Sequence, residues 1–278
     1  MARTSTASTR DPLRERLMIK PGSRVRLGQF NADETYGWTK EMATGQQQQY
    51  EERLTDLQAR LWAEGKRSLL IVLQGIDAAG KDGTIRHVMD AFNPQGCRVS
   101  AFKQPTAEEL AHDFLWRVHA RTPGRGEVGI FNRSHYEDVL VVRVHKLVSR
   151  SVSQLRYREI NDWERMLTES GTTIVKLFLY IDKDEQRHRL QARLDDPTKR
   201  WKFSRGDLAE RELWDDYLRA YEDALSRCST EWAPWYLIPA NRKWFRNVAV
   251  ARILGETLQD LNLRYPKAEP GIEDTFIP

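Results

Sequence analysis

The stretch Leu70–Arg86, "LIVLQGIDAAGKDGTIR", decides the fold of this chain. It overlaps a continuous apolar run, Ser68–Gln74, of the kind found in buried parallel strands, and a glycine-rich loop follows that run. Gly75–Lys81 fits the phosphate-loop pattern G-x-x-x-x-G-K, which normally continues with Ser or Thr. The next residue here is Asp82, so the hydroxyl that usually binds magnesium is missing.

The loop still has the chemistry of a phosphate site. Its backbone N–H groups can turn inward around phosphate oxygens, and the start of the next helix adds partial positive charge. Magnesium then needs a ligand other than a hydroxyl, and Asp77 is a carboxylate inside the loop. The alternatives are that Asp77 only caps a backbone N–H, or that the whole segment is an ordinary strand–helix turn. Asp82 is expected in the first helical turn, facing away from the phosphates.

Strand and helix patterns alternate about five times along the chain. The predicted strands are Ser68–Gln74, Cys97–Lys103, Glu127–Phe131, Thr172–Ile181 and Trp235–Ala240. The predicted helices are 46–64, one after the loop, 106–120, 136–148, 153–170, 183–194, 206–225 and 246–264. This alternation predicts a three-layer α/β fold with a parallel sheet of about five strands. We expect one kinase-like domain, residues 46–278, after an N-terminal extension, residues 1–45.

Composition sets further limits. The 278 residues carry a formal charge of +4, which suits an anionic partner without specifying nucleic acid. No run of 18 apolar residues exists, so no membrane span is predicted. Residues 1–10, "MARTSTASTR", lack an apolar stretch and are expected to be a disordered tail. Cys97 and Cys228 have no metal-ligand spacing, which favours reduced thiols in a cytoplasmic protein.

A second group of polar residues follows the third predicted strand, in "GIFNRSHYEDV", Gly129–Val139. Ligands of parallel α/β sheets bind at the carboxyl ends of the strands, so this group should face the same cleft as the loop. Its members are Asn132, Arg133, Tyr136, Glu137 and Asp138. Arg133 can bind a phosphoryl oxygen with two N–H groups, although it could also be an exposed loop arginine.

A third feature is the basic segment Arg187–Arg211, which has eight Lys or Arg and four Asp or Glu and is interrupted by Pro197 and Gly206. Beside a phosphate loop, we interpret it as a mobile lid that closes over the phosphates and excludes water. The alternative is a solvated, charged helix face.

Together, "GIDAAGKDG", "FNRSHYEDV", "DDPTKRWKFSRGDL" and "WDDY" resemble the polyphosphate kinase 2 family, most closely its class III branch. The resemblance covers nearly all of the chain from Lys20 onward. It implies a thymidylate-kinase-like P-loop fold with a helical lid, Mg²⁺ or Mn²⁺ as cofactor, and a homodimer or homotetramer. The implied reaction moves a phosphoryl group from inorganic polyphosphate to AMP and ADP, giving ADP and ATP. No nucleic-acid or membrane partner is expected.

The resemblance also implies roles for individual residues. Asp77 would bind magnesium and orient the acceptor, while Lys81 and Arg133 would hold the transferring phosphates. The residues expected at the phosphates are Gly75, Ala78, Ala79, Gly80, Lys81, Asp82, Gly83, Lys103 and Arg133. The acceptor nucleotide would contact Asn132, Tyr136 and Glu137. The lid, at about 195–211, would contribute Lys199, Arg200, Lys202 and Arg205, and the basic track could extend to Lys20, Arg24 and Arg26.

Two positions bear on the metal and the acceptor. Many relatives have Asp where this chain has Asn132, so the metal would rely on Asp77, the phosphates and Asp138. Relatives outside class III tend to have Asn where Glu137 stands, which implies that Glu137 admits AMP as well as ADP. Alternatively, Glu137 pairs with a lid arginine. The competing functions are an ATP-dependent nucleoside monophosphate kinase and a non-catalytic polyanion or nucleic-acid binder with a degenerate loop.

Overall fold

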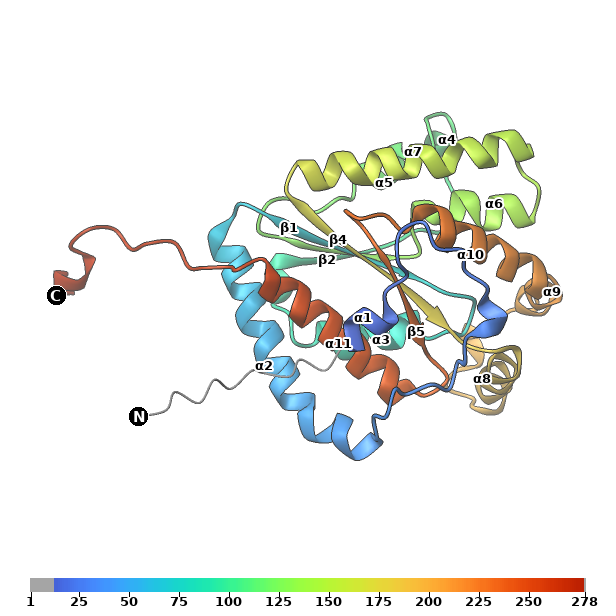
Figure 1. Ribbon diagram of the computed structural model, residues 1–278, viewed down its shortest axis with the longest axis horizontal. Coiled ribbons are helices and arrows are strands. Elements are labelled where there is room, and N and C mark those ends of the chain that lie inside the picture. Colours follow the sequence, from blue (N-terminus) through green and yellow to red (C-terminus); the bar gives the residue numbers. More distant parts are fainter. Residues whose placement is uncertain (1–12, 278) are drawn as a thin grey trace.

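The computed structural model describes residues 13–277 and contains a five-stranded, fully parallel sheet (Figure 1). The strands are β1 (Ser68–Gln74), β2 (Cys97–Ala101), β3 (Val128–Asn132), β4 (Thr172–Tyr180) and β5 (Trp235–Pro239), in the order β2-β3-β1-β4-β5. The α/β fold and all five predicted strands are confirmed. The predicted disordered tail, residues 1–10, lies outside the described residues.

Helices cover both faces of the sheet (Figure 1). Successive side chains of β1 point to opposite faces, so Ile71 packs in one hydrophobic cluster and Val72 in the other. The first cluster is covered by α2 (Lys40–Glu64), α3 (Lys81–Met89) and α11 (Lys243–Asp260). The second is covered by α7 (Arg150–Glu169) and α10 (Trp214–Cys228). Strand β1 is buried on both faces, which explains why its sequence is a continuous apolar run. This confirms the predicted buried strand.

Local side chains set the ends of the long helices. Helix α2 begins at Lys40, before the predicted start, because the Thr39 side chain accepts a hydrogen bond from the Met42 N–H at 3.3 Å. It ends at Gly65, whose φ of 60° provides the left-handed cap expected of a glycine. Helix α8 (Lys183–Asp195) is capped by Asp182.

The prediction of one helix over 106–120 was wrong. The structure has two short helices, α4 (Ala107–Leu110) and α5 (Trp116–His119). The predicted capping box of Thr106 and Glu109 is confirmed at the start of α4. The chain then leaves the helix because the Asp113 carboxylate accepts a hydrogen bond from the Leu115 N–H at 3.0 Å, which competes with helical pairing.

Two further predicted helices are also interrupted. The segment 206–225 forms α9 (Gly206–Glu212) and α10, which are separated at Leu213. The segment 136–148 begins as a 3₁₀ turn, His135–Val139, and continues as α6 (Val141–Val144). Leu140 lies between these two with non-helical dihedral angles of −106° and −86°, which changes the direction of the chain.

The N-terminal residues pack onto the sheet. Helix α1 (Leu13–Leu17) buries both of its leucines, and the Ile19 N–H donates to the Trp235 carbonyl at 2.8 Å. Met18 forms an antiparallel bridge with Tyr236 of β5. The predicted boundary at residue 45 falls inside α2.

Two expectations from composition can be compared with the structure. Within residues 13–277, no helix is both long enough and apolar enough to cross a membrane. Both cysteines are free thiols.

Candidate active site

The loop after β1 has the backbone geometry of a phosphate cradle. Gly75 has a φ of 158°, and a Cβ on it would lie 2.7 Å from the Leu179 carbonyl oxygen. A larger residue therefore does not fit at this position. Ala78 and Gly80 also have positive φ values, of 67° and 106°, so the chain curls before α3 begins at Lys81.

Lys81 lies across the mouth of this loop. Its side chain is buried, and its Nζ donates to the Gly75 carbonyl at 2.6 Å. Burial and the neighbouring Arg133 lower the pKa of Lys81 to about 8, although the Asp77 carboxylate favours the charged form. The amine is therefore held against the loop backbone, and among the described residues it forms no salt bridge.

A pH dependence of anion binding follows from this environment. Because an anion prefers the protonated amine, affinity should be high below the pKa of Lys81 and decrease as pH rises through about 8. We expect pyrophosphate affinity, measured by calorimetry, to weaken about tenfold between about pH 7 and about pH 9. The Lys81→Arg variant, whose guanidinium stays charged, should show a much flatter profile. An equally steep profile in this variant would contradict the assignment.

Asp82 occupies the first turn of α3, as predicted, but the expectation that it faces away was wrong. Its Oδ1 accepts a hydrogen bond from the Asn132 Nδ2 at 2.9 Å. Asn132 is placed there because β1 and β3 pair in parallel, with Leu73 opposite Asn132. A second carboxylate at position 132 would repel Asp82 unless a proton or cation lay between them, whereas an amide can donate.

Arg133 joins the loop to the second group of polar residues. Its Nη2 lies 2.5 Å from the Asp77 Oδ1, and its Nη1 lies 3.4 Å from the Glu137 Oε2. Burial alone would lower the pKa of Arg133, but the carboxylates of Glu137 and Asp77 outweigh it and raise the pKa. The side chain is held in this position by its own backbone, which has a φ of 62° and donates to the Leu73 carbonyl.

Two tyrosines of α10 also border this site, and the sequence analysis missed both. Burial first, and then the Glu137 carboxylate, raise the pKa of Tyr221 well above its ordinary value. Burial and Glu210, whose Oε2 accepts from the Tyr217 hydroxyl at 2.5 Å, raise the pKa of Tyr217. Tyr217 belongs to the "WDDY" motif, and Tyr221 lies one helical turn later, so the motif carried a signal that was not used.

Arg189 of α8 supports the loop from outside and was not predicted individually. Its Nη1 donates to the carbonyls of Ala78 and Ala79 at 3.0 and 2.9 Å. Its Nη2 donates to those of Ala240 and Asn241, just after β5, at 2.6 and 2.9 Å. Arg189 therefore fixes the loop relative to the end of β5. Its position in the basic segment did not distinguish it from the lid cations.

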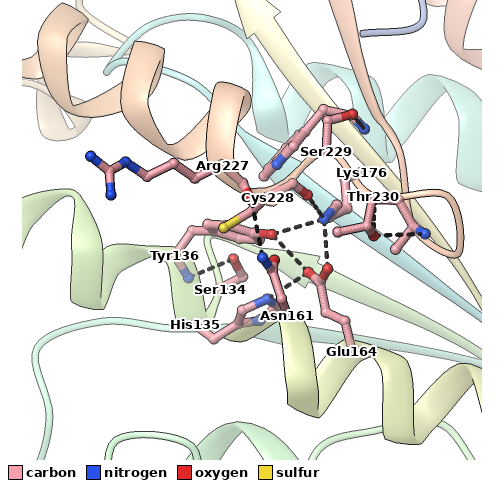
Figure 2. A network of polar contacts seen from close by, with 12 residues as sticks. Ser134, His135, Tyr136, Asn161, Glu164, Lys176, Arg227, Cys228, Ser229 and Thr230 are labelled. Carbon is pink, nitrogen blue, oxygen red and sulfur yellow. Dashed lines mark hydrogen bonds and ion pairs between the residues drawn. The ribbon is translucent and has the colours of Figure 1, made fainter. Parts of the chain in front are cut away.

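Tyr136 was expected to contact the acceptor nucleotide, but the structure places its side chain elsewhere. Its side chain is fully buried, and Figure 2 shows its hydroxyl within an internal polar network. The hydroxyl donates to Glu164 at 2.8 Å and accepts from the Lys176 Nζ at 2.9 Å. His135 Nε2 lies 3.1 Å from the same carboxylate. This part of the 3₁₀ turn faces the core, while Glu137 of the same turn faces Arg133.

Asp138 likewise turns away from the loop. Its Oδ1 accepts from the Arg156 Nη1 of α7 at 3.0 Å. Burial raises the pKa of Asp138 to about 6, against the opposing effect of Arg156. The predicted pairing of Asp77 and Asp138 around one metal gains no support from these contacts.

The four cations that were predicted to lie in a lid are exposed and do not contact the loop within the described residues. Lys199 pairs with Asp196 at 2.5 Å, and the Arg200 Nε donates to the Leu194 carbonyl at 2.7 Å. The Lys202 amine lies over the Trp201 ring, which is 78% exposed. Arg205 is exposed at the start of α9. Lys103 is exposed after β2, at the same edge of the sheet as the loop.

The oxygen ligands around the loop fit magnesium better than a transition metal. Within residues 13–277, no group of three or more His, Cys, Asp or Glu side chains is placed to hold an ion. Magnesium beside phosphates usually needs only one or two carboxylates, because phosphate oxygens and water complete its coordination. Asp77 and Asp82 both lie at the mouth of the loop, so the residues present are compatible with such an ion.

Comparisons with known proteins agree with this geometry. The family model of polyphosphate kinase 2 matches residues 38–266. The AMP/ADP-polyphosphate phosphotransferase of Meiothermus ruber is 54% identical over 93% of this chain and 98% of its own length. The ADP-polyphosphate phosphotransferase of Rhodopseudomonas palustris is 48% identical over 79% of this chain and 80% of its own.

A solved structure provides the same result for the fold. The crystal structure of polyphosphate kinase 2 from Arthrobacter aurescens superposes with a TM-score of 0.91 at 47% identity, over 94% of both chains. The P-loop at the carboxyl end of β1, with Arg133 beside it, and these matches lead to one assignment. This chain belongs to the polyphosphate kinase 2 family.

Proposed function

We propose that this protein transfers a phosphoryl group from inorganic polyphosphate to AMP and ADP, as class III members of the family do. The proposal rests on one observation, the convergence of three charged side chains at the loop. The Lys81 amine lies across the loop, and the Arg133 guanidinium contacts the Asp77 carboxylate. The name of the Meiothermus ruber relative supports both acceptors. The enzyme is expected to be a cytoplasmic homodimer or homotetramer.

The proposed reaction assigns a task to each of these residues. A terminal phosphate oxygen of the acceptor forms a bond to the last phosphorus of the polyphosphate, and the bridging P–O bond behind that phosphorus breaks. The shortened chain leaves with the electron pair. Lys81 and Arg133 stabilise the charge that moves across this centre, and Asp77 orients Arg133 and would hold a magnesium ion. Bound magnesium neutralises phosphate charge when present.

One assay tests the proposal. The purified protein is incubated with polyphosphate, magnesium and either AMP or ADP, without ATP, and the products are separated by chromatography. We expect AMP to be converted through ADP to ATP. Product formed only with ATP as donor would instead identify a nucleoside monophosphate kinase. Tight RNA binding without any nucleotide product would identify a non-catalytic binder.

Glu137 provides a sharper test of the acceptor range. AMP leaves the position of one phosphate empty, and a carboxylate there could hold water or magnesium where a neutral amide could not. We expect Glu137→Asn to reduce kcat/KM for AMP by a factor about tenfold or more larger than the factor for ADP. A difference of this size corresponds to the loss of one charged hydrogen bond. The two acceptors are compared at saturating polyphosphate.

Glu169→Asn, at an exposed position on α7, serves as the control and should leave kcat/KM unchanged for both acceptors. In the structure Glu137 pairs with Arg133 rather than with a lid arginine. An equal loss on AMP and ADP would therefore mean that Glu137 only orients Arg133 or the lid. A wild type that is inactive on AMP would remove the class III assignment.

A further inference from the structure

We propose that the buried ion pair of Lys176 and Glu164 positions Arg133 and Glu137 for the reaction. The pair holds the Tyr136 hydroxyl and, through it, the short turn that follows Arg133 and carries Glu137. Lys176, Glu164 and Tyr136 are all fully buried, so they act through this turn rather than on a substrate. The inference rests on the proposed function and extends it to side chains in the core.

The Lys176 ammonium uses all of its donors inside the protein. Its Nζ lies 2.6 Å from the Glu164 Oε2, 2.9 Å from the Tyr136 hydroxyl and 2.5 Å from the Cys228 carbonyl oxygen (Figure 2). An ammonium group has three N–H donors, and each has an acceptor here. These acceptors belong to α7, to the turn and to the last residue of α10. One side chain on β4 therefore joins three elements that are far apart in the chain.

Glu164 completes the network with its second oxygen. Its Oε1 accepts from the Tyr136 hydroxyl at 2.8 Å and lies 3.1 Å from the His135 Nε2. Burial would raise the pKa of Glu164, but Lys176 and His135 outweigh burial and lower the pKa. The carboxylate therefore stays charged. The Tyr136 hydroxyl is held between two opposite charges, since it donates to one and accepts from the other.

Stability alone gives no reason for two charges at this place. Lys176 is the only charged residue in β4, and its amine lies 5.3 Å from the ring centres of both Tyr136 and Trp235. Taking two charges out of water costs free energy, and an apolar pair of the same volume is often at least as stable. An apolar pair, however, cannot fix the direction of a hydroxyl group, whereas a charged hydrogen-bond network can.

A second contact ties the turn to the phosphate loop. Gln74 is the last residue of β1 and directly precedes Gly75. Its Nε2 donates to the Ser134 Oγ at 3.1 Å, and the same oxygen accepts from the Tyr136 N–H at 3.2 Å. Gln74 and Ser134 are both fully buried. Tyr136 is thus anchored at its hydroxyl by the ion pair and at its N–H by the end of β1.

This anchoring determines where the charged side chains of the site lie. Arg133 directly precedes Ser134, and Glu137 directly follows Tyr136. The Glu137 N–H donates to the Ser134 carbonyl at 3.0 Å, which closes a tight turn. With Tyr136 fixed in the core, Glu137 points to Arg133, and 3.4 Å separates their charged groups. A small displacement of groups that are positioned for a reaction reduces turnover strongly.

The test begins with Tyr136→Phe, which removes the hydroxyl and keeps the ring and the ion pair. We expect kcat with polyphosphate and ADP to decrease about tenfold and KM for both substrates to stay within about twofold. Lys176→Met combined with Glu164→Gln removes both charges together and should give a similar decrease. Turnover is measured well below the melting midpoint of each variant. Tyr136→Phe carries the test alone if the double variant does not fold.

The same substitution in an Arg133→Ala background separates positioning from a general structural effect. Because the hydroxyl acts through Arg133, its removal should lower kcat there by about twofold or less. A structural defect would reduce turnover by the same factor in both backgrounds. Tyr236→Phe is the matched control, a buried tyrosine on the other face of the sheet whose hydroxyl accepts from Arg14 at 3.3 Å. Its kcat should equal that of the wild type.

Two results would overturn the inference: an unchanged kcat in Tyr136→Phe, or an equal loss in the two backgrounds. Either result would leave wild-type polyphosphate-dependent activity intact, so the proposed function would stand. A wild type without that activity would refute the proposed function, and this inference with it.

Discussion

Replacing Asp77 with Asn is expected to abolish turnover, by about a thousandfold or more, while the protein stays folded. The substitution keeps the size of the side chain and removes its charge. That charge has two proposed tasks, holding magnesium and orienting the Arg133 guanidinium 2.5 Å away. The fold should survive because the side chain is partly exposed and the Asp77 backbone carbonyl still accepts from Gln186.

The measurement is steady-state turnover with polyphosphate and ADP over a range of magnesium concentrations. Asp90→Asn, an exposed position just after α3, serves as the control and should behave as wild type. An excess of chelator should abolish turnover by the wild type in the same assay. Turnover of Asp77→Asn within a few-fold of wild type at ordinary magnesium would exclude the metal role.

Replacing Arg133 or Lys81 with Ala is expected to reduce kcat about a hundredfold or more, the cost of one charge at a water-excluded transition state. Arg133→Ala also leaves Asp77 and Glu137 without their shared partner, so the two carboxylates would repel an incoming phosphate. Lys81→Ala removes the amine that lies across the loop, 2.6 Å from the Gly75 carbonyl.

Whether each substitution changes kcat or KM shows what the residue does. A loss in KM alone would mean that they bind ground state and transition state equally. Arg165→Ala, an exposed arginine on α7, removes one charge far from the loop in the chain and should leave both constants unchanged. Circular dichroism of each variant separates lost chemistry from lost structure.

The parts of the fold that follow from local patterns were predictable. The buried run of β1 and the glycines of the loop predict the strand, the cradle and the position of Lys81, and the structure has all three. Three members of the second polar group, Asn132, Arg133 and Glu137, lie beside the loop as predicted, because parallel strands bring their carboxyl ends to one edge. The other two, Tyr136 and Asp138, turn away from it. Helix interruptions were missed where one side chain, such as Asp113, competes with helical hydrogen bonding.

The orientation of individual side chains was harder to predict from the sequence. Asp82 was expected to face away because a first-turn acid usually does so, and only the pairing of β1 with β3 brings Asn132 to it. Tyr136 was expected at the acceptor, but its partners Glu164 and Lys176 lie on α7 and β4, far away in the chain. Arg189 could not be selected among many arginines until α8 was placed beside the loop.

The hydrogen bond from Ile19 to Trp235 has a consequence for solubility. Strand β5 ends the sheet, and an end strand presents unpaired backbone groups that can recruit the strand of another molecule. Here Met18 and Ile19 already occupy that edge, and the buried leucines of α1 hold them there. A chain shortened to begin at α2 would expose both the edge and the apolar surface under α1. We therefore expect such a chain to aggregate.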